Sequence, residues 1–261
     1  MERQRAKGEL FRALHDGEPF VIPNPWDAGS ARVFEGLGFK ALATTSSGFA
    51  FTLGRLDGAV TLREVAAHVA ALDHATDLPI SVDLENGYGD APEHAARAVV
   101  AVADAGAVGG SIEDYDGERL YGFDFAVERV AAAVEAARAL SFPFTLTARA
   151  ENHIRGNPDL DDTIARLQAF ETAGADVLYA PGLATVQDIR RVCDAVEKPV
   201  NVLARAQLTF DEIAGAGAQR ISVGGSLTWT SVDAVVTAAE AIRDRGDFSV
   251  LRPSPPLADW F

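Results

Sequence analysis

Short apolar runs alternate along the chain with longer Ala-rich segments of helical period. Eight of these runs have the length and composition of strands: 20–22, 41–44, 80–83, 108–112, 144–149, 177–180, 200–202 and 220–223. Between them, apolar residues recur every three or four positions, which predicts helices such as 62–75, 92–105, 125–140 and 160–173. This alternation is typical of βα units around a parallel sheet.

Several predicted helices end in a similar glycine-containing phrase, for example Asp-Ala-Gly-Ala at 104–107 and Thr-Ala-Gly-Ala at 172–175. Glycine suits the left-handed residue that ends a helix and turns the chain back toward the sheet. Eight strands and eight helices in 261 residues predict an α/β fold, a (β/α)₈ barrel of the TIM type. An open doubly wound sheet is the alternative, but no GxGxxG sequence follows the first strand.

The barrel is expected to form a single domain over 1–261, with an N-terminal helix over 1–18 and a C-terminal tail over 247–261. Prolines at 253, 255 and 256 prevent regular helix in the tail. The tail ends in two large aromatic residues, Trp260 and Phe261, which favour docking on a neighbouring surface. We therefore expect an oligomer.

Charge and composition narrow the range of partners. The formal net charge is −15, with acidic residues spread along the chain, which disfavours nucleic acid and anionic membranes as partners. No apolar stretch is long enough to span a membrane, and the charged N-terminus does not read as a signal peptide. The single cysteine, Cys193, excludes an internal disulfide framework. We predict a cytoplasmic protein.

Acidic residues gather where the predicted strands end, at the rim where such barrels carry their chemistry. Asp83 and Glu85 are two positions apart on an extended segment and share a face, and Glu113 ends the next strand. Crowded carboxylates would protonate unless a cation neutralised them, and an all-oxygen set favours Mg²⁺, with Mn²⁺ also possible. The other interpretation is a solvated rim whose acids pair with the nearby arginines Arg55, Arg149 and Arg155.

Two kinds of anion-binding group accompany the acids. Arg149 ends an otherwise apolar strand, and its planar fork suits the carboxylate or phosphoryl group of a substrate. The alternative for Arg149 is an ion pair with Glu113 or Glu151. The segment 45–48 offers hydroxyls and backbone N–H groups to an anion. The segment 223–226 reads either as a phosphate grip or as a tight turn with a serine cap.

Five motifs together resemble the isocitrate lyase/phosphoenolpyruvate mutase superfamily: PNPWDA at 23–28, DLENGYG at 83–89, IED at 112–114, ARAE at 148–151 and ISVGGS at 221–226. The resemblance covers nearly the whole barrel. It implies a Mg²⁺-dependent enzyme that makes or breaks C–C or P–C bonds beside a 2-oxo acid, through an enolpyruvate-like species on the metal. It also implies a homotetramer, or a dimer, in which the last helix is swapped between subunits.

The resemblance implies roles for individual residues. Asp83 resembles the direct metal ligand, and the carboxylates that hold metal waters correspond to Asp57, Glu85 and Glu113. Arg149 resembles the arginine that grips the anionic group of the substrate. Thr45 and Ser46 stand where the family usually has Ser-Gly. The expected substrate-binding residues are Trp26, Asp27, Thr45, Ser46, Ser47, Arg149 and Asn201.

The segment 113–124, expected to be a mobile lid, departs from the lyase pattern. Isocitrate and methylisocitrate lyases carry Lys-Lys-Cys-Gly-His there, with the cysteine as acid/base, and this chain has no Cys, His or Lys in the segment. Phosphoenolpyruvate mutases have a histidine after strand six, where this chain has Pro181. The lid offers Tyr115, Tyr121 and Arg119 for proton transfer, and the expected catalytic residues are Arg149, Glu113 and Tyr115.

The sequence therefore predicts a Mg²⁺-dependent lyase or decarboxylase that cleaves a C–C bond of a small 2-oxo (di)carboxylate. One alternative is a P–C bond enzyme similar to phosphoenolpyruvate phosphonomutase. Another is a barrel that binds oxo acids without catalysis, which the missing lid cysteine leaves open.

Overall fold

The strands of the barrel form one parallel sheet in the order β1-β8-β7-β6-β5-β4-β3-β2 in the computed structural model, which describes residues 2–255 and 257–260. The backbone N–H of Ala43 donates to the carbonyl of Pro23 at 3.0 Å, which joins the two ends of the sheet. The strands are β1 (Phe20–Ile22), β2 (Leu42–Ala43), β3 (Ile80–Asp83), β4 (Gly109–Glu113), β5 (Thr145–Arg149), β6 (Val177–Tyr179), β7 (Val200–Leu203) and β8 (Arg220–Ser222). The predicted (β/α)₈ barrel is confirmed, with each strand within two residues of its expected bounds.

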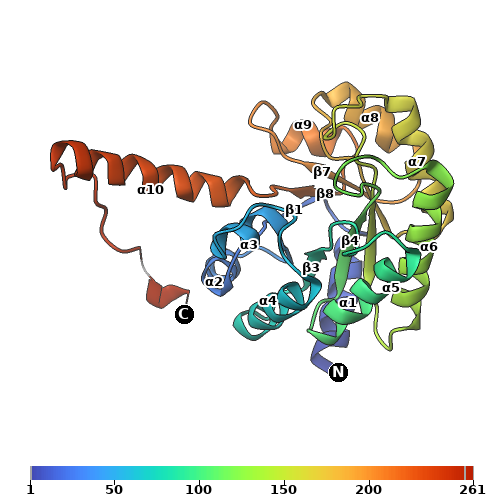
Figure 1. Cartoon of the computed structure of the whole chain (residues 1–261), viewed down its shortest axis with the longest axis horizontal. Coiled ribbons are helices and arrows are strands. Elements are labelled where there is room, and N and C mark those ends of the chain that lie inside the picture. Colours follow the sequence, from blue (N-terminus) through green and yellow to red (C-terminus); the bar gives the residue numbers. More distant parts are fainter. Residues whose placement is uncertain (1, 256, 261) are drawn as a thin grey trace.

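Helices surround the sheet and alternate with its strands (Figure 1). They are α1 (Glu2–Leu14), α2 (Ala28–Gly36), α3 (Ser46–Thr52), α4 (Leu62–Ala75), α5 (Pro92–Asp104), α6 (Phe123–Ala139), α7 (Leu160–Thr172), α8 (Val186–Ala195), α9 (Phe210–Gly215) and α10 (Ser226–Arg245). The expected count of eight is thus too low for the described residues. The two further helices are α1, which lies within the N-terminal helix expected over 1–18, and α3, a two-turn helix that is too short to show a period in the sequence.

Local sequence explains where several helices begin. Thr61 and Glu64 form a reciprocal capping box at α4, and Thr209 and Glu212 form another at α9. Pro92 occupies the first turn of α5, where its missing N–H costs no helical hydrogen bond. These signals fix the helix starts, and hence the lengths of the loops that leave the strands.

Helix α1 closes the end of the barrel opposite the strands' carboxyl ends. Its Phe11 is fully buried, and a Cβ built on Gly109 of β4 would lie 2.7 Å from the Phe11 ring. Only glycine therefore allows β4 and α1 to approach so closely. With one end filled in this way, the open end of the barrel carries the polar residues.

Helix α10 projects away from the barrel, and the chain after it turns back (Figure 1). Within the returning tail, Leu257–Asp259 forms a 3-10 helix and the Trp260 ring lies against Gly36 of α2. The tail tryptophan therefore contacts its own chain, whereas Phe261 lies outside the described residues. Among the described helices, none combines the length and apolar character needed to cross a bilayer.

Candidate active site

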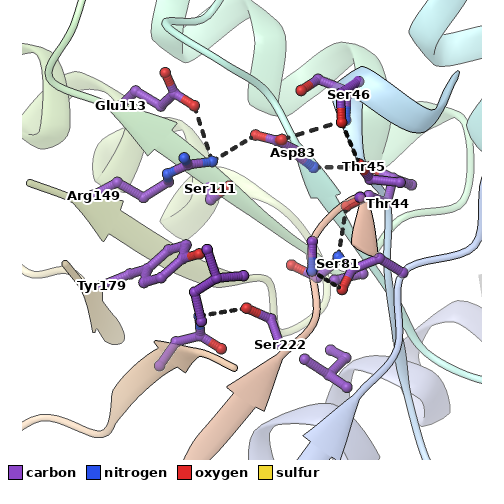
Figure 2. A pocket seen from close by; sticks show the side chains of 18 of the residues that line it. Thr44, Thr45, Ser46, Ser81, Asp83, Ser111, Glu113, Arg149, Tyr179 and Ser222 are labelled. Carbon is purple, nitrogen blue, oxygen red and sulfur yellow. Dashed lines mark hydrogen bonds and ion pairs between the residues drawn. The ribbon is translucent and has the colours of Figure 1, made fainter. Parts of the chain in front are cut away.

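A cavity of about 210 Å³ opens at the carboxyl ends of the strands (Figure 2). Every strand places at least one residue on its wall. A second cavity lies beside it, and the two share Ser46, Asp57, Glu113 and Arg155 on their walls. Asp83, Glu113 and Arg149 line the first cavity, as predicted for strand ends of a barrel. Glu85 lines only the second cavity, because the chain turns after Asp83 and is not extended there as expected.

Arg149 is the centre of the ion pairs in the first cavity (Figure 2). Its Nη1 lies 3.0 Å from Asp83 Oδ1 and 2.9 Å from Glu113 Oε1, and its Nη2 lies 2.9 Å from Glu151 Oε1. Burial alone would lower the pKa of Arg149, but the three carboxylates raise it well above the usual value. The alternative role of Arg149, an ion pair with Glu113 or Glu151, is therefore observed. Arg149 pairs with both glutamates and also with Asp83.

The parallel register explains this convergence. Glu113 of β4 is paired with Arg149 of β5, and Asp83 of β3 is paired with Ser111 of β4. Side chains two positions apart on a strand point to the same side, so Asp83, Glu113 and Arg149 all face the barrel mouth. The Arg149 guanidinium also lies 5.1 Å from the centre of the Tyr179 ring on β6.

The acidic side chains are crowded enough to change their ionisation. Burial, followed by the charges of Asp83 and Asp57, raises the pKa of Glu85 to about 8. Burial raises the pKa of Glu113 to about 8 as well; Arg149 opposes this rise, while Glu151 and Asp83 add to it. Carboxyl groups with raised pKa values keep their protons near neutral pH, and a cation that binds among them has to displace those protons.

The donor set is all oxygen, which fits a hard divalent cation such as Mg²⁺. Its present arrangement is not that of a formed metal site, since no three His, Cys, Asp or Glu side chains of the described residues converge closely enough to ligate one ion. Asp83 is held instead by Arg149 and by the backbone N–H of Ser46, which donates to Asp83 Oδ2 at 3.4 Å. The residue chemistry therefore fits the cation, although the carboxylates are engaged by Arg149.

The loop after β3 holds Glu85 in a strained conformation. Glu85 has φ 48° and Tyr88 has φ 62°, in the left-handed region that residues with a side chain seldom adopt. Arg129 of α6, 1% exposed, donates to the backbone carbonyls of this loop, at 3.0 Å to Gly89 and also to Asn86 and Asp90. These hydrogen bonds hold the carboxylate of Glu85 at the second cavity.

Tyr121 links the lid to the same loop. Its hydroxyl donates to Asp90 Oδ1 at 2.8 Å and accepts from Asn86 Nδ2 at 3.2 Å, and its ring lies 4.5 Å from the Arg129 guanidinium. Neither cavity is lined by Tyr121. It therefore packs the base of the lid and does not face the site.

Tyr115 is the one of the three lid candidates for proton transfer that lines a cavity. It lines the second cavity, its hydroxyl donates to the carbonyl of Gly117 at 2.9 Å, and the Arg155 guanidinium lies 4.0 Å from its ring centre. Arg119, the third proton-transfer candidate, lines neither cavity and pairs with Asp116. Cys193 lies on α8, away from both cavities, and burial raises its thiol pKa to about 12, which disfavours the reactive thiolate.

The loop after β2 is placed as expected. Thr45, Ser46 and Ser47 line the first cavity, and Thr45 also caps α3 by accepting from the N–H of Gly48 at 3.3 Å. The loop after β8 brings Gly224 and Gly225 to the same cavity. Gly225, not Ser226, occupies the cap position of α10, so the serine-cap interpretation is wrong.

Trp26 and Asp27 line neither cavity. Asp27 Oδ1 accepts from the Ser30 N–H at 2.7 Å and caps α2. Asn24, from the same motif, accepts from the N–H groups of residues 223 and 224 and donates to the Thr44 carbonyl at 3.0 Å. The motif thus serves helix capping and barrel closure, and the structure does not bring Trp26 and Asp27 together with the other predicted substrate residues.

The floor of the cavity is a polar network around Arg220, which was not predicted, and it includes the predicted substrate residue Asn201, which lines the cavity. Arg220, fully enclosed, donates to Asn201 Oδ1 at 2.9 Å and to Thr147 Oγ1 at 2.9 Å, and its Nη1 lies 3.2 Å from His15 Nε2. No carboxylate among the described residues pairs with it, and burial lowers the pKa of Arg220 to about 10. Asn201 in turn donates to Ser222 Oγ at 3.0 Å. The sequence signal that could have indicated this network is Arg220, a charged residue at the start of the short strand β8.

Comparison with known proteins places this barrel in a family. The family profile described as phosphoenolpyruvate phosphomutase matches residues 11–243. An uncharacterized protein of Mycobacterium tuberculosis is 32% identical over 231 residues, 88% of this chain and 87% of that protein. An oxaloacetate decarboxylase of Paraburkholderia xenovorans is 37% identical over 202 residues, 73% of this chain and 66% of that protein.

The chain is also similar to proteins whose structures have been solved. A putative lyase/mutase from Burkholderia cenocepacia J2315 has a TM-score of 0.96 and 49% identity, covering 99% of this chain and 96% of that one. A phosphonopyruvate hydrolase in complex with oxalate and Mg²⁺ has a TM-score of 0.84 and 23% identity, covering 95% and 92%, and shares the fold.

Proposed function

Because the chain belongs to the phosphoenolpyruvate phosphomutase family, we propose that it is an enzyme that cleaves a C–C bond of a small 2-oxo (di)carboxylate with Mg²⁺ as its cofactor. The observation that carries the proposal is the convergence of Asp83, Glu113 and Arg149 on one cavity at the barrel mouth. The decarboxylase among the relatives supports the choice of a C–C bond.

The acidic side chains are assigned to the cofactor. Asp83, together with Asp57, Glu85 and Glu113, would hold Mg²⁺, or Mn²⁺ in its place. When bound, the ion supplies a Lewis acid for the negative charge that develops on an oxygen when a bond next to a ketone breaks. A cation that binds at Glu85 and Glu113 would displace their protons, so its affinity is expected to rise with pH.

The remaining residues are assigned to the substrate. Arg149 offers a planar fork to the substrate carboxylate, and Thr45, Ser46 and Ser47 offer hydroxyl and N–H groups from the opposite wall. Asn201, fixed by Arg220 and Ser222, presents its amide from the floor. Tyr115 is assigned the proton transfer, because it is the lid phenol that lines a cavity.

The test is pyruvate release from oxaloacetate, methylisocitrate and phosphonopyruvate, each assayed with and without Mg²⁺. The proposal expects Mg²⁺-dependent pyruvate from one of the first two. Conversion of phosphonopyruvate alone, either to phosphoenolpyruvate or to pyruvate and phosphate, would favour the P–C alternative. Absence of turnover with all three, together with retained oxalate binding, would mean a protein that binds oxo acids without catalysis.

We also propose that the chain assembles as a homotetramer, or as a dimer, through a swapped α10. This helix projects from the barrel and leaves Trp229, Val235 and Val236 substantially exposed (Figure 1). Apolar side chains gathered on a projecting helix favour burial against another subunit. The predicted cytoplasmic location is kept as part of this proposal and is supported by the single cysteine.

A further inference from the structure

Arg155 is the arginine that the assignments above leave without a role, although it lines both cavities. We infer that Arg155 binds the distal anionic group of a doubly charged substrate, so that the site selects dicarboxylates over monocarboxylates. The inference rests on the proposed function, which assigns the other end of the substrate to the site at Asp83 and Arg149.

Three arginines line the first cavity, and they differ in how far their side chains are exposed. The Arg149 side chain is 11% exposed and is held by three carboxylates. Arg220 lies in the floor and is engaged by Asn201, Thr147 and His15. The Arg155 side chain is 35% exposed, in the loop between β5 and α7. It is therefore the cation that a substrate group reaching toward the cavity mouth would meet.

The surroundings of Arg155 orient its guanidinium and leave part of it available. Its Nε donates to Glu151 Oε2 at 3.1 Å, and its Nη2 lies 3.1 Å from Glu151 Oε2 and 3.2 Å from Glu113 Oε2. The Tyr115 ring lies against it, 4.0 Å from its central carbon. Its Nη1 has no hydrogen-bond partner in the described part of the chain. A planar fork held on one edge can donate from the other edge to a carboxylate.

The charges around the second cavity show why a substrate anion would need Arg155. The second cavity is lined by four acids, Asp57, Glu85, Glu113 and Asp116, and by one cation, Arg155. Without Arg155, this wall would repel a second carboxylate on the substrate. Ile154, the neighbouring residue, also lines the first cavity and offers an apolar contact to the carbon chain between the two anionic groups.

The test compares two ligands that differ in the distal group. Mg²⁺-loaded protein is titrated calorimetrically with two ligands. Oxalate is a two-carbon diacid with no further carboxylate beyond its first two carbons, whereas 3,3-difluorooxaloacetate is a four-carbon diacid with a distal carboxylate. Arg155→Gln is expected to weaken the four-carbon ligand about tenfold or more, as loss of a charged hydrogen bond does, while oxalate affinity stays within about threefold. Arg155→Lys, which keeps the charge, should fall between. The control is Arg191→Gln, which removes a surface pair with Asp161.

Retained oxalate binding also shows that the variant is folded. The inference is overturned if Arg155→Gln weakens both ligands equally, because Arg155 would then only hold Glu113 and Glu151 in place. It is also overturned if neither affinity changes. If the wild-type protein binds neither ligand, the proposed function fails and this inference fails with it. If wild-type binds both but Arg155→Gln does not discriminate, only the inference fails.

Discussion

Arg149 lies between Asp83 and Glu113, 3.0 Å from the first carboxylate and 2.9 Å from the second, so that one cation joins the ends of β3, β4 and β5. A residue in this place does two things. It compensates buried negative charge, and it is aimed at the cavity where a substrate anion would bind. The proposed function requires that the ion pair between Asp83 and Arg149 be given up. Asp83 would then be free to bind a metal ion, and Arg149 would be free to bind the substrate.

Replacing Arg149 tests its part in stability. Arg149→Met leaves Glu113 and Glu151 buried with the more exposed Arg155 as their one remaining shared cation, and we expect the free energy of unfolding to fall by about 3 kcal/mol. Arg149→Lys keeps the charge and should lose less. Urea denaturation followed by circular dichroism measures both. Equal stability of Arg149→Met and wild type would show that the glutamates are neutral in the folded protein without Arg149.

Arg129 is expected to matter for metal affinity, although it lines neither cavity. Arg129→Met removes the donors that hold the strained loop of Glu85, so the Mg²⁺ concentration for half-maximal binding should rise about tenfold. Calorimetric titration with Mg²⁺ measures this. The matched control is Arg243→Gln, whose side chain pairs with Asp244 at the surface. Unchanged Mg²⁺ affinity in Arg129→Met would restrict Arg129 to a structural role.

His15 predicts a dependence of stability on pH. Burial, with Arg220 nearby, lowers the pKa of His15 from 6.5 to about 3, so the folded protein keeps His15 neutral while the unfolded chain protonates below pH 6.5. The unfolded state then binds the extra proton, and the stability that the neutral ring provides is lost as the pH falls from 6.5 toward 3. While only the unfolded state is protonated, the loss is about 1.4 kcal/mol per pH unit.

The matched measurement is the difference in unfolding free energy between wild type and His15→Gln at pH 7.5, 6 and 5. A glutamine oxygen can still accept from Arg220 but does not titrate. The wild-type protein should lose stability relative to the variant on going from pH 7.5 to pH 5. A constant difference would mean that His15 titrates with the same pKa in the folded and unfolded states.

Helix α10 provides the test of assembly. Val235 is 68% exposed and Val236 is 48% exposed, and both would become buried if another subunit covers the helix. Light scattering after size-exclusion chromatography should give a mass of two or four chains of 27.6 kDa. Val235→Asp combined with Val236→Asp should reduce the mass toward one chain. A monomeric wild-type protein would contradict the swapped-helix proposal.

The sequence predicted the barrel and the composition of its rim because both depend on short-range signals. The alternation of strand and helix is local, and residues at successive strand ends of a barrel must meet. Asp83, Glu113 and Arg149 could therefore be placed together from their positions alone. The metal role of the acids remains a prediction, because the ion pairs with Arg149 are what the structure shows.

Other features depend on contacts that no local pattern reveals. Arg220 binds His15, 205 positions away, and nothing near either residue predicts that pairing. Asp27 reads equally well as a site aspartate or as a helix cap, and only its 2.7 Å contact with the Ser30 N–H distinguishes the two. The sequence predicts Arg155 only as a neutralising partner for the rim acids. Its place on both cavity walls depends on how the loop after β5 folds.

The central claim is that Asp83 belongs to a Mg²⁺ site at the barrel mouth, and calorimetric titration of wild type and Asp83→Ala with Mg²⁺ tests it most directly. Asp161→Ala, a change at an exposed residue of α7, is the control. We predict that wild type and the control bind one Mg²⁺ per chain and that Asp83→Ala, still folded by circular dichroism, binds none. Undiminished Mg²⁺ binding by Asp83→Ala would contradict the assignment of the carboxylate cluster.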